Sequence, residues 1–328
     1  MALAPVPRER IGMGKRQGHK FMKAMVFDRF GGPEILRAAD VPMPKVGPGE
    51  ILIRVRSAAV NPVDWKIMAG MLDGIMQSYF PVTPGWDVSG VVEAVGFDTP
   101  EFSPGDEVIA YARKSVIHDG SFAEFITVSA QAAARKPARL DWDQAAGLPL
   151  AGLTAYQLLT RLGMKSGDVV LIHAAAGGVG ILGAQVAVAA GARVIGTASP
   201  ANHEFLRGFG IEPVAYGEGL EQRIRALAPA GVDIVADFVG GVAEVSEAVL
   251  KTGGRMGSIV DGSMLPDGGL YAWVRPNGAD LQKLADLADA GRLSVPLARV
   301  FPLEEAADAL ALSKTGHARG KIAIQVSR

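Results

Sequence analysis

The sequence predicts an α/β protein in which a doubly wound parallel-sheet domain is inserted in a β-rich domain. Three observations lead to this fold class. The chain has 328 residues, which is enough for two domains of ordinary size. Short apolar stretches separated by glycine and proline turns fill residues 22–145, whereas strand-like and helix-like segments alternate through residues 146–291. The tail, residues 292–328, returns to strand-like sequence, so we expect it to complete the first domain.

The first 21 residues carry five basic side chains and one acidic side chain. We expect residues 1–21 to form a disordered extension, with ordered sequence beginning at Met22. The segment has no apolar core resembling that of a secretory signal. Export is therefore not expected, and we expect a cytoplasmic location.

Residues 22–145 contain apolar stretches of strand length at 51–56, 88–95, 108–110 and 125–128. Turn signals separate them, including Gly47-Pro48-Gly49, Asn61-Pro62 and Pro84-Gly85. This density of short strands predicts a small antiparallel, barrel-like domain.

The second domain begins with an alanine-rich helical pattern over residues 144–162. Continuous apolar strands are then expected at 169–172, 193–197, 233–236 and 255–260, and helices at 179–190, 202–208, 221–227, 242–250 and 280–290. Such alternation predicts a parallel sheet covered by helices on both faces. In the tail, residues 321–326 predict one more strand.

Composition excludes several classes of function. The formal net charge of −1 gives no broad attraction to nucleic acid or to an anionic membrane surface, so neither is an expected partner. No apolar run reaches the ~18 residues that a membrane span needs. The chain has no cysteine, which rules out disulfides, thiolate nucleophiles and zinc sites built on cysteine.

A glycine turn follows the predicted strand 169–172 and opens the predicted helix 179–190. Ala175-Ala176-Gly177-Gly178-Val179-Gly180 matches G-x-G-x-x-G with alanine at the first position. Small residues are needed there because the chain turns tightly, the backbone touches a pyrophosphate, and the helix packs on the strand. The turn predicts a dinucleotide site formed by Ala175, Gly177, Gly178, Val179 and Gly180; the alternative is a purely structural tight turn.

The end of the next strand bears on the choice between NAD and NADP. An acidic residue there would hydrogen-bond the ribose 2′-hydroxyl and repel a 2′-phosphate. The sequence is Gly196-Thr197-Ala198-Ser199-Pro200, without a carboxylate. Ser199 can donate to a phosphate, and Asn202 and His203 follow in the first turn of the next helix; His203 can equally be a solvated surface histidine. We therefore expect NADPH as the cofactor.

At this point the sequence resembles a known family, the zinc-free, quinone-oxidoreductase-like (zeta-crystallin-like) branch of the medium-chain dehydrogenase/reductases. The resemblance runs from Met22 to the C-terminus and rests on ordered blocks, among them Asn61-Pro62-Val63-Asp64-Trp65-Lys66, Pro84-Gly85-Trp86-Asp87-Val88-Ser89-Gly90, Leu148-Pro149-Leu150-Ala151-Gly152-Leu153-Thr154, the glycine turn, and Arg319-Gly320-Lys321. It implies a GroES-like catalytic domain formed by 22–145 plus 292–328, a Rossmann domain formed by 146–291, a cleft between them, and a homodimer.

The same resemblance bears on metal binding. Zinc-dependent members use a Cys, a His and a second Cys, and the first two positions here are Asn61 and Trp86. No cysteine exists for the third, so we expect no catalytic zinc of that type. Without a Lewis acid, the remaining chemistry is hydride transfer to an acceptor that supplies its own electrophilicity, a quinone or an activated C=C bond of an α,β-unsaturated carbonyl.

The resemblance also implies the residues of the site. The nicotinamide would lie between Asn61 and Asp64 on one side and Thr154 on the other, although Asn61-Pro62 is also a turn signal and Asp64 can be a helix cap. Val239 and Val260 follow strand ends that would flank the ribose and carboxamide, and Tyr216 resembles a position that touches the adenosine phosphate. We considered Tyr79, Tyr111, Lys66 and bulk water as the source of the proton, and included Tyr79 among the candidate catalytic residues.

Two other functions remain open on the sequence. An enoyl-thioester reductase in a biosynthetic pathway would use the same hydride chemistry. A protein that binds NADPH without catalysis is the alternative from a different class, because this fold can host it.

Overall fold

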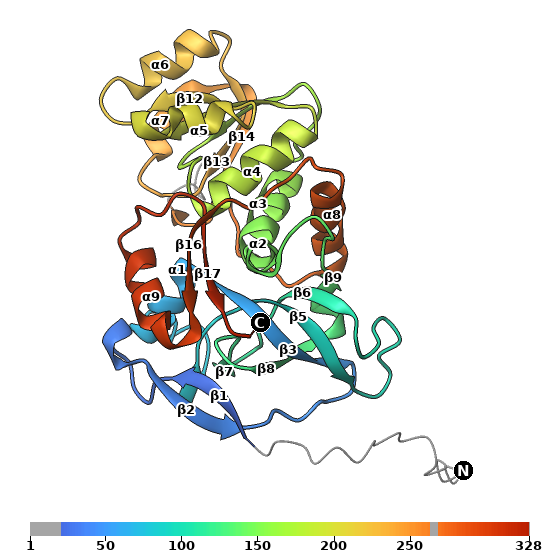
Figure 1. The fold of residues 1–328 in the computed structure, drawn as a ribbon. Coiled ribbons are helices and arrows are strands. Elements are labelled where there is room, and N and C mark those ends of the chain that lie inside the picture. Colours follow the sequence, from blue (N-terminus) through green and yellow to red (C-terminus); the bar gives the residue numbers. More distant parts are fainter. Residues whose placement is uncertain (1–20, 263–267, 328) are drawn as a thin grey trace, which may run out of the picture.

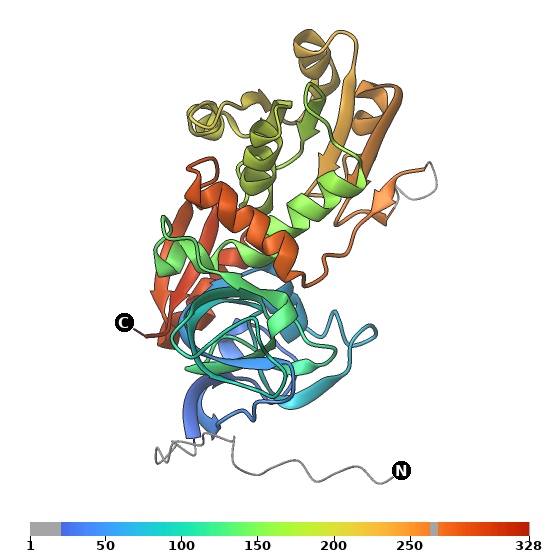
Figure 2. The same ribbon diagram turned by 90° about the vertical axis from the view of Figure 1, so that its right-hand side faces the viewer.

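The structure is a computed structural model that describes residues 21–262 and 268–327. The predicted N-terminal extension lies outside the described residues apart from Phe21, which begins the first strand. The molecule has two parts, visible one above the other in Figure 1: an upper part built on a parallel sheet and a lower part built mainly on antiparallel strands. Figure 2, turned by a quarter, shows helices of both parts between the two sheets.

The lower part is organised around a seven-stranded sheet. Its order is β16-β17-β3-β5-β6-β9, and β8 pairs with β3 along the edge opposite to β5. All its pairs are antiparallel except β16–β17. Strand β17, from the C-terminal end of the chain, lies against β3, as the strand-like tail predicts. The strands are β3 (Glu50–Val60), β5 (Asp87–Val95), β6 (Glu107–Tyr111), β8 (Phe125–Ser129), β9 (Ala133–Arg135), β16 (Leu297–Pro302) and β17 (Lys321–Gln325).

Two small sheets and several helices complete this part. The antiparallel pair is β1 (Phe21–Val26) with β2 (Arg37–Pro42), and the parallel pair is β4 (Ser78–Thr83) with β7 (Ile117–Asp119). The helices are α1 (Pro62–Met68), α2 (Trp142–Ala146) and α9 (Ala306–Lys314), with short 3₁₀ turns η2 (Pro33–Ile35), η3 (Ala130–Ala132) and η6 (Leu303–Glu305).

The upper part contains a six-stranded sheet, parallel throughout, in the order β12-β11-β10-β13-β14-β15. Its strands are β10 (Val169–Ile172), β11 (Arg193–Ala198), β12 (Glu212–Ala215), β13 (Val232–Asp237), β14 (Leu250–Ser258) and β15 (Leu270–Tyr271). Its helices are α3 (Pro149–Arg161), α4 (Gly178–Ala189), α5 (His203–Arg207), α6 (Leu220–Leu227), α7 (Ala243–Val249) and α8 (Gly278–Asp289), with η4 (Pro200–Asn202) before α5. The strand order reverses on either side of β10, and ligands of such sheets bind at the carboxyl ends of the strands beside this reversal.

The predicted α/β class, with a GroES-like part and a Rossmann-like parallel sheet, is confirmed, but local details differ from the sequence prediction. The single helix expected over 144–162 is two helices, α2 and α3, because Pro149 lacks a backbone N–H and begins a new helix. Strand β14 begins at Leu250, earlier than expected, and the edge strand β15 was not expected. The boundaries at residues 145/146 and 291/292 stay predictions.

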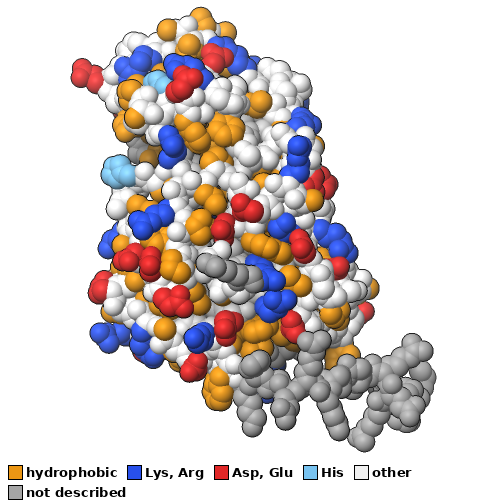
Figure 3. All heavy atoms as spheres, in the orientation of Figure 1, with side chains coloured by type: hydrophobic (Ala, Val, Ile, Leu, Met, Phe, Trp, Pro, Cys, Tyr) orange, Lys and Arg blue, Asp and Glu red, His pale blue; other side chains and the backbone are white. Residues whose placement is uncertain are grey.

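One buried apolar cluster joins the two parts. It includes Ile109 and Ile324 from the lower sheet, Leu153 from α3, and Ile172 from the parallel sheet. Helix α3 therefore packs on both sides and fixes the two sheets relative to each other. On the face in Figure 3, acidic and basic side chains are interspersed. No helix in the described ranges is both long and apolar enough to cross a membrane.

Candidate active site

Two adjoining hollows lie where the upper and lower parts meet. The first, the α1 hollow, has a volume of about 600 Å³ and is lined by α1, α3 and residues after β13 and β14. The second, the β11 hollow, has a volume of about 850 Å³ and is lined by the ends of β10, β11 and β12. The residues shared by both are Ala174, Gly177, Val239, Gly316 and Ala318, so the hollows form one cleft along the carboxyl edge of the parallel sheet.

The glycine turn lies where the two hollows join. Strand β10 ends in buried valine, leucine and isoleucine side chains, the backbone turns at Ala174 with a φ of 55°, and α4 begins after Gly177. No side chain caps this helix and its first residues line the cleft, so the positive end of the helix dipole lies at the cleft. Gly177, Gly178, Val179 and Gly180 line the α1 hollow, whereas Ala175 is buried behind the turn.

Gly180 and Gly177 have different roles in the turn. A Cβ on Gly180 would lie 2.8 Å from the Cα of Ala175 and closer still to the carbonyl of Ala174, so only glycine fits against this backbone. A Cβ on Gly177 would meet only the carbonyl oxygen of Ala174 within 4 Å, at 3.3 Å. The absence of a side chain at Gly177 therefore leaves open space in the cleft, and the turn fits the pyrophosphate of a dinucleotide.

Residues after β11 line the β11 hollow, as expected for a site that holds an adenosine. Ser199 and Asn202 lie there together, with Asn202 Nδ2 donating to Ser199 Oγ at 3.3 Å, and the exposed Tyr216 lies on the same hollow. His203 is not among the lining residues, and its Nε2 lies 3.4 Å from the carbonyl oxygen of Ala198. Glu221 of α6, which the sequence analysis did not consider, also lines this hollow.

A buried histidine lies beneath the β11 hollow. Ser246 Oγ donates to the carbonyl of Val242 at 2.6 Å, so the 3.2 Å contact with His173 requires Nε2 of the histidine to be the donor. The other ring nitrogen, Nδ1, lies 3.5 Å from Thr197 Oγ1. Burial lowers the pKa of His173 to about 4, so the ring is neutral near pH 7.

The carboxylate at the end of β13 shapes the wall that carries two predicted site residues. Asp237 is buried and accepts hydrogen bonds from the backbone of Val239 and Gly240 and from Ser258 Oγ. Ser258 Oγ in turn accepts from the backbone N–H of Val260 at 3.0 Å. These bonds turn the backbone so that Val239 and Val260 are half-exposed on the cleft wall.

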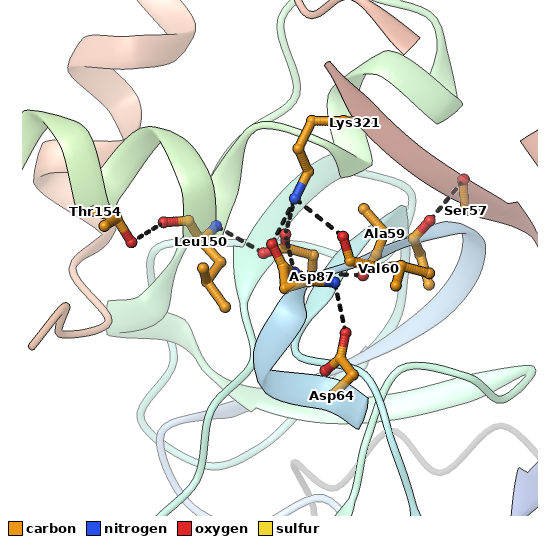
Figure 4. A network of polar contacts seen from close by, with 10 residues as sticks. Ser57, Ala59, Val60, Asp64, Asp87, Leu150, Thr154 and Lys321 are labelled. Carbon is orange, nitrogen blue, oxygen red and sulfur yellow. Dashed lines mark hydrogen bonds and ion pairs between the residues drawn. The ribbon is translucent and has the colours of Figure 1, made fainter. Parts of the chain in front are cut away.

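A buried polar network forms the floor of the α1 hollow (Figure 4). Asn61, on the connection from β3 to α1, donates from Nδ2 to Asp87 Oδ2 at 2.8 Å. The ammonium of Lys321 on β17 donates to Asn61 Oδ1 and lies 3.6 Å from Asp87 Oδ2. The other oxygen of Asp87 accepts from the backbone N–H of Leu150 at 2.7 Å, and Thr154 Oγ1 donates to the Leu150 carbonyl at 2.6 Å. Asn61 and Thr154, both predicted as site residues, therefore line one hollow and share one network.

Asp64 has a different environment from Asn61. Its Oδ2 accepts from the backbone N–H of Asn61 at 2.7 Å, which closes a capping box at the start of α1. The carboxyl is fully buried and does not line either hollow. Burial raises the pKa of Asp64 from 3.8 to about 7, with its bond to Asn61 acting in the opposite direction.

The structure separates the predicted proton sources. Tyr79 lies on β4, is 55% exposed, and is not among the residues lining the cleft. Tyr111 lines the α1 hollow and packs edge-on against Trp86, with ring centroids 6.1 Å apart; burial raises its pKa. Lys66 also lines this hollow, with Nζ 5.6 Å from the centre of the Trp65 ring.

Lys321 and Asp87 are the residues of the floor that the sequence analysis did not assign to the site. A signal was present, because each places a charge next to an otherwise apolar strand, and both belong to blocks that carry the family resemblance. The same floor offers no metal site: among the described residues no group of three or more His, Cys, Asp or Glu side chains is arranged to hold a metal ion.

Comparison with known proteins gives consistent matches over most of the chain. Residues 47–138 match the family model described as alcohol dehydrogenase GroES-like domain, and residues 210–324 match the model described as zinc-binding dehydrogenase. An NADPH-dependent alkenal/one oxidoreductase of Arabidopsis thaliana is 34% identical, over 93% of this chain and 80% of its own length. A quinone oxidoreductase of Sus scrofa is 31% identical, over 89% of this chain and 94% of its own length. The solved quinone oxidoreductase from Coxiella burnetii has a TM-score of 0.84 and 35% identity, covering 94% of this chain and 100% of that one.

Proposed function

The chain belongs to the quinone-oxidoreductase-like branch of the medium-chain dehydrogenase/reductase superfamily, and from this membership we propose that it is an NADPH-dependent, zinc-independent reductase of quinones and α,β-unsaturated carbonyls. The observation that carries this proposal is the continuity of the cleft. The uncapped N-terminus of α4 joins a hollow with the residues expected for an adenosine to a hollow with Asn61 and Thr154. A dinucleotide bound along this edge supplies the hydride.

The residues of the cleft divide into three groups in this proposal. Gly177, Gly178, Val179 and Gly180 hold the pyrophosphate, with Ala175 packing behind the turn. Ser199, Asn202 and Tyr216 contact the adenosine end; His203 belongs to this group only if its ring leaves the carbonyl of Ala198. Asn61 and Thr154 orient the nicotinamide, and Val239 and Val260 exclude water from the ribose and carboxamide.

The α1 hollow suits an acceptor that gains negative charge on oxygen. Among the described residues that line it, the charged side chains are Lys66 and Lys321, and the rest are polar or apolar. The ammonium of Lys321 is directed to acceptors in the floor, so of the two charged lining residues that the structure describes, Lys66 is the one placed to approach a carbonyl or quinone oxygen. We assign to Lys66 two roles, stabilisation of that oxygen and delivery of the proton. The other candidates have weaker support as proton donors. Asp64 is buried in its cap, Tyr79 does not line the cleft, and burial raises the pKa of Tyr111, so its hydroxyl keeps its proton.

Preference for NADPH over NADH rests on the end of β11. Ser199 lies there in place of a carboxylate, with Asn202 and Tyr216 on the same hollow. Glu221 on α6 is the feature that opposes a 2′-phosphate, and its distance from the bound phosphate decides how strict the preference is.

Homodimer formation is part of the proposal on family grounds alone, and light scattering after gel filtration measures it. A cytoplasmic location stays a prediction.

The decisive experiment follows absorbance at 340 nm with NADPH and then NADH. The acceptors are 1,4-benzoquinone, 9,10-phenanthrenequinone, an enone, an enal and crotonyl-CoA, each with a reaction lacking protein to subtract direct oxidation by the quinone. We expect faster consumption of NADPH than NADH with quinones, with the enone or enal, or with both. Turnover of crotonyl-CoA alone would make the protein an enoyl-thioester reductase. Binding of NADPH without turnover of any acceptor would contradict catalysis and favour a non-catalytic NADPH-binding protein.

A further inference from the structure

The floor of the α1 hollow contains an ion pair that the proposed chemistry does not use directly. The side chains of Lys321 and Asp87 are 4% and 0% exposed, and their charged atoms lie 3.6 Å apart. Around Lys321 Nζ stand three oxygens: Asn61 Oδ1, the Val60 carbonyl at 3.3 Å, and Asp87 Oδ2. All three are acceptors, an environment that suits an ammonium with its donors directed into the floor; burial lowers the pKa of Lys321, and the attraction to Asp87 opposes that shift.

This arrangement fixes the amide of Asn61 in one orientation. Lysine can only donate and an ionised aspartate can only accept, so the amide oxygen faces Lys321 and the amide nitrogen faces Asp87. The backbone N–H of Asn61 is held separately by Asp64. With either charged partner gone, the amide would lose one of the two contacts that distinguish its orientations.

The pair also connects Asn61 to the opposite element of the hollow. Asp87 Oδ1 accepts from the backbone N–H of Leu150, in the first turn of α3, and Thr154 Oγ1 bonds to the Leu150 carbonyl one turn later. Figure 4 shows Asp87 between Lys321 and Leu150, with Thr154 beyond. A shift of Asp87 therefore moves both Asn61 and the start of α3.

The stem of Lys321 reaches the glycine turn. A Cβ on Gly178 would lie 2.9 Å from Lys321 Cδ, so the missing side chain of Gly178 makes room for the lysine stem. The preceding residue is bonded to the same turn, because the Gly320 N–H donates to the Ala176 carbonyl at 3.1 Å. One side chain thus spans from the turn assigned to the pyrophosphate to the amide assigned to the nicotinamide.

We propose that Lys321 and Asp87 are a positioning pair for hydride transfer, which holds Asn61 and the start of α3, and with it Thr154, at fixed positions relative to the glycine turn. The inference rests on the proposed function, since it assigns the pair to the nicotinamide end of the cleft. A buried ion pair is weak evidence for stability, because desolvation offsets the attraction between the charges. Its value here lies in specifying one geometry, and misplacement of reacting groups by about 1 Å can cost on the order of 100-fold in rate.

The test uses Lys321→Met, which keeps a stem of similar length without the charge, Asp87→Asn, and the double variant. Lys314→Met, an exposed lysine on α9, is the matched control. The readouts are kcat and KM with the best acceptor, the Kd of NADPH, the emission of bound NADPH, and the thermal unfolding midpoint. We expect Lys321→Met to lower kcat about 10- to 100-fold while the Kd of NADPH changes by less than about threefold, because the methionine stem still packs on the turn. The double variant should lose no more than the worse single variant, since each single change leaves one buried charge unpaired.

Unchanged kcat in folded Lys321→Met, or losses that multiply in the double variant, would overturn the positioning role. If Lys321→Met does not fold, the double variant, which leaves neither charge of the pair, is compared with the wild type and with Asp87→Asn. A wild-type kcat in the double variant, or a loss larger than that of Asp87→Asn, would then overturn the positioning role. If the wild-type protein turns over no acceptor, the proposed function fails. The positioning role of Lys321 and Asp87 is then tested only by the emission and Kd of bound NADPH. An altered emission of bound NADPH at unchanged Kd would then still support a role in seating the nicotinamide, whereas identical emission would contradict it.

Discussion

Replacement of Gly177 by alanine separates the structural from the binding role of the glycine turn. Gly177 has a φ of −75° and a ψ of 170°, a conformation that alanine adopts without strain. Its new Cβ would touch only the Ala174 carbonyl oxygen, at 3.3 Å, so we expect the free energy of unfolding to change by less than about 0.5 kcal/mol. The methyl group would enter the space assigned to the pyrophosphate, and overpacking of about 1–3 kcal/mol raises the Kd of NADPH about 5- to 150-fold.

Two further glycine variants make the comparison sharp. Gly180→Ala places its Cβ 2.8 Å from the Cα of Ala175, in rigid backbone, so it should lower the free energy of unfolding by about 1–3 kcal/mol. Gly208→Ala, at the end of α5, has the same 3.3 Å approach to a carbonyl oxygen but lines neither hollow, and should change neither quantity. Fluorescence titration with NADPH and urea unfolding measure the two effects. Wild-type affinity in Gly177→Ala would refute the assignment of the turn to the pyrophosphate.

Three other predictions concern single side chains of the site. Ser199→Asp should erode the preference for NADPH, because a carboxylate repels a 2′-phosphate and accepts from a ribose hydroxyl; an unchanged ratio of kcat/KM for NADPH and NADH would contradict the assignment. Lys66→Met should lower kcat about 100-fold or more without weakening NADPH binding, and undiminished turnover would remove Lys66 from the mechanism. For Asp64, a folded-state pKa of about 7 against an ordinary value of 3.8 means that the folded protein holds a proton that the unfolded chain has released. The wild-type free energy of unfolding should therefore fall as pH rises from about 4 to about 7, and Asp64→Asn should reduce that slope; equal slopes in urea unfolding of the two proteins would refute it.

The glycine turn was predictable because its information is local. The apolar strand, the small residues and the following helix are contiguous in sequence, and the chemistry fixes their spacing. The break between α2 and α3 was equally local, since Pro149 cannot continue a helix, yet the alanine-rich pattern around it concealed the break.

The floor of the α1 hollow was not predictable in the same way. Asn61 directly follows β3, Asp87 begins β5 and Lys321 begins β17, and the pairing of these strands depends on the sheet order. A single sequence shows that a charged residue next to an apolar strand is unusual. It does not show which other buried group that residue will contact in the folded protein. Tyr79 shows the converse limit: it was a candidate through the family resemblance, whereas its side chain on β4 is exposed and lines neither hollow.

The central claim is that this cleft transfers hydride from NADPH directly to an electron-poor acceptor, and isotope transfer tests it most directly. The protein is incubated with NADPH carrying deuterium at C4, in separate reactions for each face of the nicotinamide, together with the enone of the acceptor panel in ordinary water. We predict that one of the two cofactors delivers its deuterium to the β-carbon of the product, as read by mass spectrometry and NMR. Reduced enone without cofactor deuterium at that carbon, or no reduction of either enone or quinone by protein that binds NADPH, would contradict the account.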